Sequence, residues 1–515
     1  MNLISSNDLE LLNDNIKKIV DDIHYRVEKR KEQEITQHID IASQPEDNES
    51  SEKEPTTEDV NNVPTESETK TETTDKEIPK LYLEDVKDII GIILKFVSDN
   101  KLKVYGGYAH NKVISNKKPS DAFYSEQDVP DIDVMSPSPI QHMVQICDIL
   151  EEKGFPGVVG KEAIHEGTYR VYVRDYNALD LSYVPTNIFN SVPFIKIDNI
   201  NYIHPQFAML DLLKMITEPN YSSWRWEKTV PRLYLLQHHF PIYKSKKSLE
   251  QIITHKKNVD KELNIIFNYL KNKDDVMLLG DYVYNKYVDL TKIKKHNNLI
   301  EPVDITHYEF IATKYTKTVL EILDLLKKQN KNVKIVEYYP YFNLTDFSIK
   351  IYCDNELVAV IYGNNSRCVP VKKLEIDKKN YVTVGCFDFV YLSLLINSFR
   401  MKTINDIQKK MYYTIQSQNI VEMRNYYFEK NNKNLLDNTL FQSFLDETTC
   451  IGPAVDTLQE AKDKRKQRKQ EGKRPLFIYK PVKELTTVWT FKNSSGNAIN
   501  NQKNKKITNL IKKQK

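Results

Sequence analysis

The sequence predicts an α+β fold in which a small mixed sheet has helices packed on one face. Alternating apolar and polar residues indicate strands at 169–174 and 178–183. Apolar residues recur at helical spacing in three further segments, 138–153, 204–216 and 222–239. Strands and helices therefore alternate within residues 80–240, which is about the length of one domain.

Three more elements are predicted before the first of these. Residues 3–35 carry apolar side chains at helical spacing. We interpret them as a packing helix, and a helix that forms a dimer is the alternative. A second helix is predicted over 83–97. Val104 and Tyr105 then form a short strand that leads into the glycine pair Gly106–Gly107.

A second sheet is predicted in the C-terminal half. Its strands are 333–336, 347–352 and 357–362. An apolar helix over 386–399 follows them, as 207–213 follows the first sheet. We therefore predict a second copy of the same fold. It has neither a Gly-Gly pair nor an Asp-x-Asp motif, so we expect it to be catalytically inactive and to serve packing, binding or subunit contact.

Charge is distributed unevenly along the 515 residues, although the formal net charge is only +3. Residues 45–80 are acidic and poor in large apolar side chains, which predicts disorder. The opposite holds for 462–469 and 503–515, which are strongly basic. Basic blocks are typical of nucleic-acid contact, but also of solvated helix faces and localisation signals. Packing of 476–479 onto the body would make part of this tail structural.

The cysteines and the apolar segments indicate the compartment. The chain has 5 cysteines, and no pair has the spacing of metal ligands, so we expect reduced thiols in the core. No apolar stretch approaches a signal peptide or a membrane span. We therefore expect a soluble, intracellular protein of the cytoplasm. The predicted regions are an N-terminal helical segment (1–41), an acidic disordered linker (42–79), the first sheet domain (80–240), a helical region (241–330), the second, degenerate domain (331–450) and a basic tail (451–515).

Three aspartates are the candidate functional residues. Asp131 and Asp133 stand in Pro-Asp-Ile-Asp-Val-Met, and Asp180 stands in Ala-Leu-Asp-Leu-Ser-Tyr-Val. Residues 131–135 are predicted to form a strand, and alternate residues of a strand point to the same side, so the carboxylates of Asp131 and Asp133 converge while Ile132 and Val134 face the core. A third carboxylate on a neighbouring strand completes a set of hard oxygen ligands for divalent cations. Coincidence is the alternative, because paired acids flank many strands and turns.

Three motifs carry a resemblance to a known family. They are Gly-Gly-Tyr-Ala-His-Asn (106–111), Pro-Asp-Ile-Asp-Val-Met-Ser (130–136) and Leu-Asp-Leu-Ser-Tyr-Val-Pro (179–185). Together they resemble the polymerase-beta-type nucleotidyltransferases. More closely, residues 80–240 resemble the poly(A) polymerase catalytic subunits of poxviruses, African swine fever virus and giant viruses. One departure is the longer stretch between Gly107 and Asp131, which contains a polar insertion at 115–121.

The resemblance implies a template-independent addition of AMP from ATP to RNA 3′ ends, assisted by two Mg²⁺ or Mn²⁺ ions. Asp131 and Asp133 would hold both ions, and Asp180 would complete the site where the 3′-hydroxyl is activated. Gly106 and Gly107 would let the backbone approach the triphosphate, where a side chain would block it. The polar insertion changes the spacing on which this role of the glycine pair depends, whereas the aspartate motifs match the family.

Lys214, Lys228 and Arg225 could contact the triphosphate, where positive charge offsets the charge that develops in phosphoryl transfer. Of these we assign Lys214 and Lys228 together to the triphosphate, while Arg225 stands between Trp224 and Trp226. The alternative is that all three are cations of a helix surface beside a packed tryptophan.

Two other functions fit the same residues. One is another RNA nucleotidyltransferase, such as a terminal uridylyl or tRNA-end-adding enzyme. The other is a non-catalytic RNA-binding subunit with vestigial acids. No residue reads the base directly, so the preference for ATP rests on the resemblance. The expected partners are ATP and an RNA 3′ end, with a homodimer and a separate processivity subunit both left open and no membrane expected.

Overall fold

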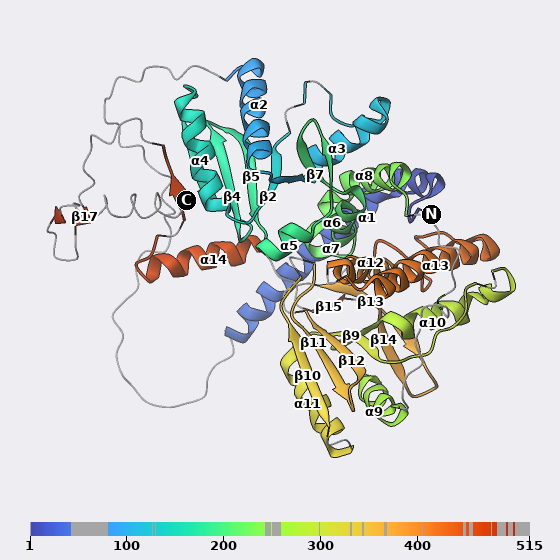
Figure 1. The fold of residues 1–515 in the computed structure, drawn as a ribbon. Coiled ribbons are helices and arrows are strands. Elements are labelled where there is room, and N and C mark those ends of the chain that lie inside the picture. The colour runs from blue at the N-terminus through green and yellow to red at the C-terminus, as the bar shows by residue number, and fades with distance from the viewer. Residues whose placement is uncertain are drawn as a thin grey trace, which may run out of the picture.

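The structure, a computed structural model, has two sheet-containing halves joined by helices (Figure 1). It describes residues 2–42, 81–125, 127–128, 130–242, 249, 259–297, 299–329, 332–341, 344–364, 368–403, 405–445, 450–452, 457–474, 476–481, 491–492 and 498–499. The predicted acidic linker, apart from its first residue, and the basic residues 503–515 therefore lie outside the described residues. No helix in the described ranges is long and apolar enough to cross a bilayer.

The first sheet is mixed, as predicted, with the strand order β16-β3-β4-β5-β2-β1-β7-β6. Its strands are β1 (Lys103–Tyr105), β2 (Ile132–Ser136), β3 (Val158–Glu162), β4 (Thr168–Val173), β5 (Tyr176–Tyr183), β6 (Phe194–Ile197), β7 (Ile200–Ile203) and β16 (Ile478–Tyr479). Helices α2 (Leu83–Asp99) and α4 (Pro139–Glu152) pack against it. Ile132 and Val134 of β2 are fully buried, so the alternation predicted for this strand is present.

The remaining helical elements of this half connect the strands or follow them. They are α3 (Gly106–Lys117), η1 (Pro119–Asp121), α5 (Thr186–Ser191), α6 (Pro205–Ile216), α7 (Pro219–Ser222), η2 (Ser223–Arg225) and α8 (Trp226–His239). The segment predicted as one helix over 222–239 thus starts with a short 3-10 turn before α8. That turn leaves Trp224 exposed while Trp226 is fully buried.

The second sheet has the strand order β10-β11-β12-β9-β8-β14-β13-β15. Its strands are β8 (Val276–Leu279), β9 (Tyr308–Ala312), β10 (Val333–Tyr338), β11 (Ser348–Cys353), β12 (Glu356–Gly363), β13 (Val369–Glu375), β14 (Tyr381–Gly385) and β15 (Cys450–Ile451). Its helical elements are α9 (Asp260–Leu270), α10 (Gly280–Thr291), η3 (Ile293–Lys295), α11 (Tyr315–Gln329), α12 (Phe387–Thr403) and α13 (Ile407–Asn431).

The second sheet repeats the first. From β10 to β13 it has the same order of parallel and antiparallel pairs as the first sheet has from β3 to β6. The helices after β7 and β14, α6 and α12, contact each other, and the rings of Phe207 and Phe399 are 5.3 Å apart between centroids. The predicted duplication is therefore confirmed, with the two corresponding helices at the interface (Figure 1).

The second copy begins earlier than its predicted boundary at 331. Strands β8 and β9 lie inside 241–330, which the sequence predicts to be helical. Every residue of both strands is buried, so neither strand has the alternation that identifies a half-exposed strand. A short apolar run of this kind looks the same in a buried strand and a buried helix.

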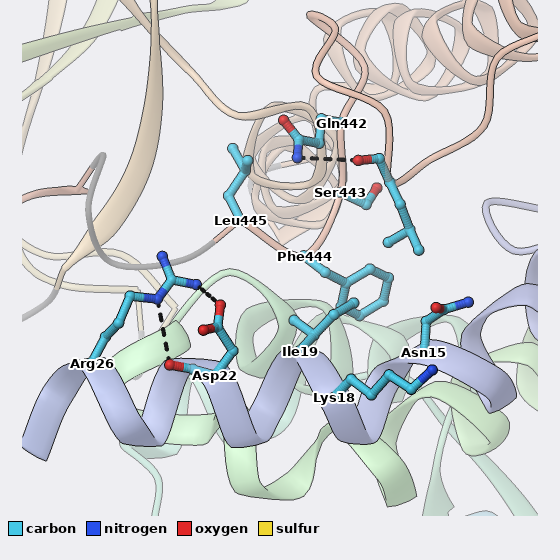
Figure 2. A pocket seen from close by; sticks show the side chains of 10 residues that line it. Asn15, Lys18, Ile19, Asp22, Arg26, Gln442, Ser443, Phe444 and Leu445 are labelled. Carbon is cyan, nitrogen blue, oxygen red and sulfur yellow. Dashed lines mark hydrogen bonds and ion pairs between the residues drawn. The ribbon is translucent and has the colours of Figure 1, made fainter.

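Helix α1 (Ser6–Ala42) is a packing helix that joins the two halves. Leu12, Ile16 and Ile23 are buried. Just before it, the backbone of Leu3 donates to Gln237 of α8 at 2.8 Å and accepts a hydrogen bond from Arg424 of α13. Figure 2 shows a cavity of about 420 Å³ that residues of α1 and residues 442–445 line.

One cysteine pair corrects the expectation of reduced thiols. Cys450 lies in β15 and Cys368 directly precedes β13. The two cysteines form a disulfide across these paired strands of the second sheet. Cys147, Cys353 and Cys386 are free and buried, as expected of core thiols. The two bonded cysteines are separated by 82 residues, and sequence spacing does not reveal a pair brought together by sheet register.

The basic C-terminal segment is partly docked. Helix α14 (Thr457–Gln470) is followed by β16, which pairs with the edge strand β3. Tyr479 also donates to Asp148 of α4. The alternative in which 476–479 pack onto the body is therefore confirmed for β16. A further hairpin is formed by β17 (Phe491–Lys492) and β18 (Ala498–Ile499).

Candidate active site

The three aspartates meet at one edge of the first sheet. β2 and β5 are parallel neighbours, and Asp133 lies opposite Asp180 in their register. Asp131 directly precedes β2, two residues from Asp133 and therefore on the same side. One carboxylate oxygen of each residue lies within 4.8 Å of the others. The convergence expected from strand alternation is thus present, and the third carboxylate comes from the neighbouring strand.

Gly106 is required by the approach of Asp133. It stands at the junction of β1 and α3 with φ +72°, a backbone conformation that residues with a side chain rarely adopt. A Cβ at this position would lie 2.0 Å from Oδ2 of Asp133. A glycine is therefore needed here because Asp133 occupies the space that a side chain would fill.

Gly107 has a different environment. A Cβ there would lie 2.6 Å from the hydroxyl of Tyr124 and 3.0 Å from Arg232 of α8. Tyr124 belongs to the longer stretch between the glycine pair and the aspartates, and its backbone is fixed by Asn111, which accepts its N–H at 3.0 Å. The polar insertion thus ends in a segment that folds back against the start of α3.

Negative charge is concentrated in the site. Burial, followed by the carboxylates of Asp131, Asp180 and Asp211, raises the pKa of Asp133 well above its usual range. Arg225 opposes this rise. A buried carboxylate surrounded by others is unfavourable unless a cation compensates it. The site therefore favours a positive ligand.

Asp180 is held by Arg170. The two residues lie opposite each other on antiparallel strands β4 and β5. Nε and Nη2 of Arg170 both lie 3.0 Å from Oδ2 of Asp180. Burial raises the pKa of Asp180, and Arg170 counteracts the rise. Oδ1 of Asp180 is buried and accepts no hydrogen bond from the described residues, which leaves it as a ligand atom.

The candidate cations occupy three different places. Lys214 is buried and lines a cavity of about 220 Å³ between α6 and the second sheet, together with Glu218 and Tyr362. Lys228 is exposed on α8. Arg225 is the candidate whose charge acts on Asp133. Arg225 is therefore the candidate whose charge favours the ionised form of Asp133, and Lys214 lies at the contact between the two halves.

Sequence reasoning missed two residues of this site, Arg170 and Asp211. Arg170 could have been found from the hairpin, because a tight turn near Asp175 puts the strand of Arg170 beside that of Asp180. Asp211 lies on α6, and only the packing of this helix against the sheet brings its charge near Asp133.

The second copy retains part of the same geometry. Gly280, at the junction of β8 and α10, has φ +60°, and a Cβ there would lie 2.6 Å from Oε2 of Glu309. Glu309 corresponds to Asp133, since each lies opposite the residue before its glycine. By the same registers, Val360 stands where the first copy has Asp180. Two residues before Glu309 is His307, so the acidic triad is reduced to one carboxylate.

Side chains close this reduced site. The hydroxyls of Tyr413 and Tyr362 donate to Oε1 of Glu309 at 3.3 and 3.4 Å. Tyr412 donates to Asp281 at 2.6 Å. Helix α13, which supplies Tyr412 and Tyr413, therefore covers the place where the first copy is open to its carboxylates.

Glu309 makes a testable contribution to stability. Burial and Asp281 raise its pKa from 4.5 to about 7. The folded state therefore holds its proton more tightly than the unfolded state, and stability falls as the pH rises from 4.5 through 7. Glu309→Gln should remove this loss. At pH 8 its free energy of unfolding, measured with urea, should exceed that of the wild type by up to about 3 kcal/mol, and at pH 4.5 the two should be equal.

The control for this measurement is Glu375→Gln, an exposed position on β13 of the same sheet. It should have the pH dependence of the wild type. If Glu309→Gln and the wild type differ in unfolding free energy by the same amount at pH 8 and at pH 4.5, the raised pKa of Glu309 is contradicted.

Comparisons with known proteins agree with the geometry. Residues 91–222 match the family model "Poly(A) polymerase catalytic subunit". Residues 235–509 match the model "APMV, Putative poly(A) polymerase, catalytic subunit, C-terminal". The Megavirus polyadenylate synthase crystal structure has a TM-score of 0.72 and 28% identity to this chain, and covers 82% of this chain and 88% of its own.

Two viral relatives show how far the likeness extends. The "Putative poly(A) polymerase catalytic subunit" of Acanthamoeba polyphaga mimivirus is 31% identical over 467 residues, which is 82% of this chain and 78% of the relative. The protein of the same name from African swine fever virus is 32% identical over 164 residues, 31% of this chain and 34% of the relative. Since the likeness to the mimivirus protein spans both halves, the chain belongs to the family of viral poly(A) polymerase catalytic subunits.

Proposed function

We propose that this chain is a template-independent poly(A) polymerase that transfers AMP from ATP to the 3′ end of RNA. The family supports the reaction, and the gathering of Asp131, Asp133 and Asp180 within 4.8 Å beside the Gly106 turn supports its place. In this reaction the RNA 3′-hydroxyl attacks the α-phosphate of ATP, and pyrophosphate leaves. Because the family consists of catalytic subunits, it favours a catalytic role for the chain over a purely RNA-binding one.

The three carboxylates fit divalent cations, and we propose them as the ligands of two Mg²⁺ or Mn²⁺ ions. The buried, unpartnered Oδ1 of Asp180 and the crowded carboxylate of Asp133 are hard oxygen donors that need positive charge. Bound ions of this kind activate a hydroxyl and offset the charge on phosphate.

The chain itself positions the nucleotide. The first N–H groups of α3 have no partner inside the helix, and the helix starts at the Gly106 turn beside Asp133. Such N–H groups bind phosphate, so we propose that the triphosphate lies at this end of α3. Arg225 is the cation that we propose beside it, in place of Lys214. Lys228 stays a candidate for the outer part of the site.

A nucleotide-addition assay tests the proposed function. A short RNA primer is incubated with labelled ATP, UTP, CTP or GTP and Mg²⁺ or Mn²⁺. We expect a ladder of products with ATP that disappears when a chelator removes the metal. Efficient use of UTP or CTP instead would indicate a uridylyl or tRNA-end-adding enzyme. No addition of any nucleotide would indicate a non-catalytic subunit.

Arg170 should act as a positioning residue. Arg170→Ala removes both hydrogen bonds that hold Oδ2 of Asp180, so the concentration of Mg²⁺ or Mn²⁺ for half-maximal activity should rise. The loss of activity should be about 10- to 100-fold at low metal. Lys161→Ala, which lies opposite Arg170 on β3, is the matched control and should be near wild type. A metal dependence unchanged in Arg170→Ala would contradict this role.

The setting of the enzyme is also a proposal. The relatives are proteins of large DNA viruses, so we propose that it acts in the host cytoplasm or in the virion. A second copy of the chain and a separate processivity subunit are both compatible with a catalytic subunit. Light scattering of the purified chain, alone and with RNA, tests for the second copy.

A further inference from the structure

An exposed tryptophan contacts Arg225, the cation proposed for the candidate active site. Trp224, in η2, is 59% exposed, and its indole N–H donates to the carbonyl of Tyr221 at 3.2 Å. The guanidinium carbon of Arg225 lies 4.5 Å from the centroid of its ring. An indole that is held in place but open to solvent offers a flat surface on which a nucleobase can stack.

This tryptophan is linked to the carboxylates through the turn between β3 and β4. The hydroxyl of Tyr221 and Nδ1 of His165, which belongs to that turn, are 3.3 Å apart. Burial and then Arg225 lower the pKa of His165, while Asp180 acts in the opposite direction. His165 therefore joins the tryptophan segment to the turn between β3 and β4, and the charges of both Arg225 and Asp180 act on it.

Helix α14 docks on the same turn. Lys464 pairs with Glu166 at 2.8 Å, and Arg465 donates to the carbonyl of Ala163 at 3.4 Å. Arg468 pairs at 2.8 Å with Glu162, the last residue of β3. β16 then fixes the chain after the helix to the edge of the first sheet. The helix is thus a fixed part of the catalytic half.

A second face of α14 is basic and open to solvent. Lys462, Lys466 and Lys469 are exposed and follow one another at intervals of four and three residues, so they share one face of the helix. They differ from Arg465 and Arg468, which are half-buried and contact the body. Three exposed cations in a row on a docked helix match the repeating charge of a nucleic-acid backbone.

We propose that the primer RNA lies on this surface, with a base near its 3′ end stacked on Trp224 and its backbone along Lys462, Lys466 and Lys469. The proposal rests on the proposed function, since it names how the RNA substrate of the same site is held. Stacking on an aromatic ring combined with contacts from cations is how proteins bind single strands without regard to sequence. The docked turn of β3 and β4 connects the two parts.

The lysines are tested by binding of a short, fluorescently labelled single-stranded RNA, measured by anisotropy without ATP over a range of NaCl concentrations. The triple variant Lys462→Gln/Lys466→Gln/Lys469→Gln should bind more weakly. Each lost phosphate contact lowers the slope of log affinity against log salt by about 0.7, so the slope should fall by about 2. The control is Lys317→Gln/Lys327→Gln/Lys328→Gln, three exposed lysines of α11 with the same change in net charge.

Trp224 is tested by kinetics with the primer and ATP varied in turn. Trp224→Ala should raise KM for the primer about 10-fold, and more than it raises KM for ATP through Arg225, which rests on the ring. Trp224→Phe, which keeps a ring, should stay near wild type. A Trp224→Ala variant with an unchanged KM for the primer would overturn the stacking assignment. Equal salt slopes for both triple variants would overturn the lysine assignment.

Failure of the proposed function would give a different result. In that case the wild-type chain would not add AMP, while the anisotropy measurements would still report whether the α14 lysines bind RNA. The unfolding temperature of each variant is compared with that of the wild type. Equal temperatures show that a change in binding does not come from misfolding.

Discussion

Replacing Asp133 with asparagine should abolish nucleotide addition and at the same time stabilise the metal-free protein. Asparagine keeps the shape of the side chain but lacks the charge that a divalent cation needs, so activity should fall at least about 1,000-fold, equivalent to ~4 kcal/mol. Asp131→Ala should lose activity to a similar extent, since it removes another of the three converging carboxylates.

The gain in stability follows from the crowding of the carboxylates. The pKa of Asp133 is raised by burial and by its acidic neighbours, so its ionised form disfavours the folded state at neutral pH. The neutral asparagine avoids this loss, and the difference should vanish in acid, where the wild-type side chain is protonated in both states. Thermal unfolding of the metal-free protein at pH 7 and in acid measures the gain and its disappearance, and unfolding at pH 7 with Mg²⁺ measures the lost stabilisation by the metal.

The control for Asp133→Asn is Asp175→Asn, an exposed position in the turn between β4 and β5. It should retain both activity and the stabilisation by Mg²⁺. Near-wild-type extension of RNA by Asp133→Asn would show that the metal site lies elsewhere. An unchanged unfolding temperature in the metal-free state would show that the acidic neighbours do not destabilise the site.

Gly106→Ala should have the second-largest effect. The new Cβ would need φ +72° and would stand 2.0 Å from Oδ2 of Asp133, so the turn or the carboxylate must move. We expect a destabilisation of about 2 kcal/mol or more and a loss of activity of at least about 100-fold, since an ångström-scale displacement of a reacting group costs that much. Urea unfolding and primer extension measure the two losses separately.

Two other glycines provide matched controls. Gly91→Ala, within α2 where a Cβ meets nothing within 4 Å, should stabilise the protein slightly. Gly280→Ala repeats the substitution in the second copy, where the Cβ would lie 2.6 Å from Glu309. It should lower stability and leave the activity of the folded fraction near wild type. Equal losses of activity from Gly106→Ala and Gly280→Ala would assign the effect to folding alone.

The sequence by itself determines the elements with a clear period and the convergence of Asp131 and Asp133. Asp131 and Asp133 share one side of β2 because the side chains of a strand alternate, whatever the rest of the chain does. The apolar periodicity of α4 and α6 and the alternation of β4 and β5 are likewise local properties, so these elements appear close to their predicted bounds.

Other features depend on pairing between distant segments, which only the tertiary structure decides. Sheet register places Arg170 on Asp180 and joins Cys368 to Cys450, and packing of α6 brings Asp211 near the carboxylates. The fully buried β8 and β9 have no local period. Gly280 and Glu309 are recognisable as counterparts of Gly106 and Asp133 only when the registers of the two sheets are compared, because the same fold can carry different side chains at corresponding places.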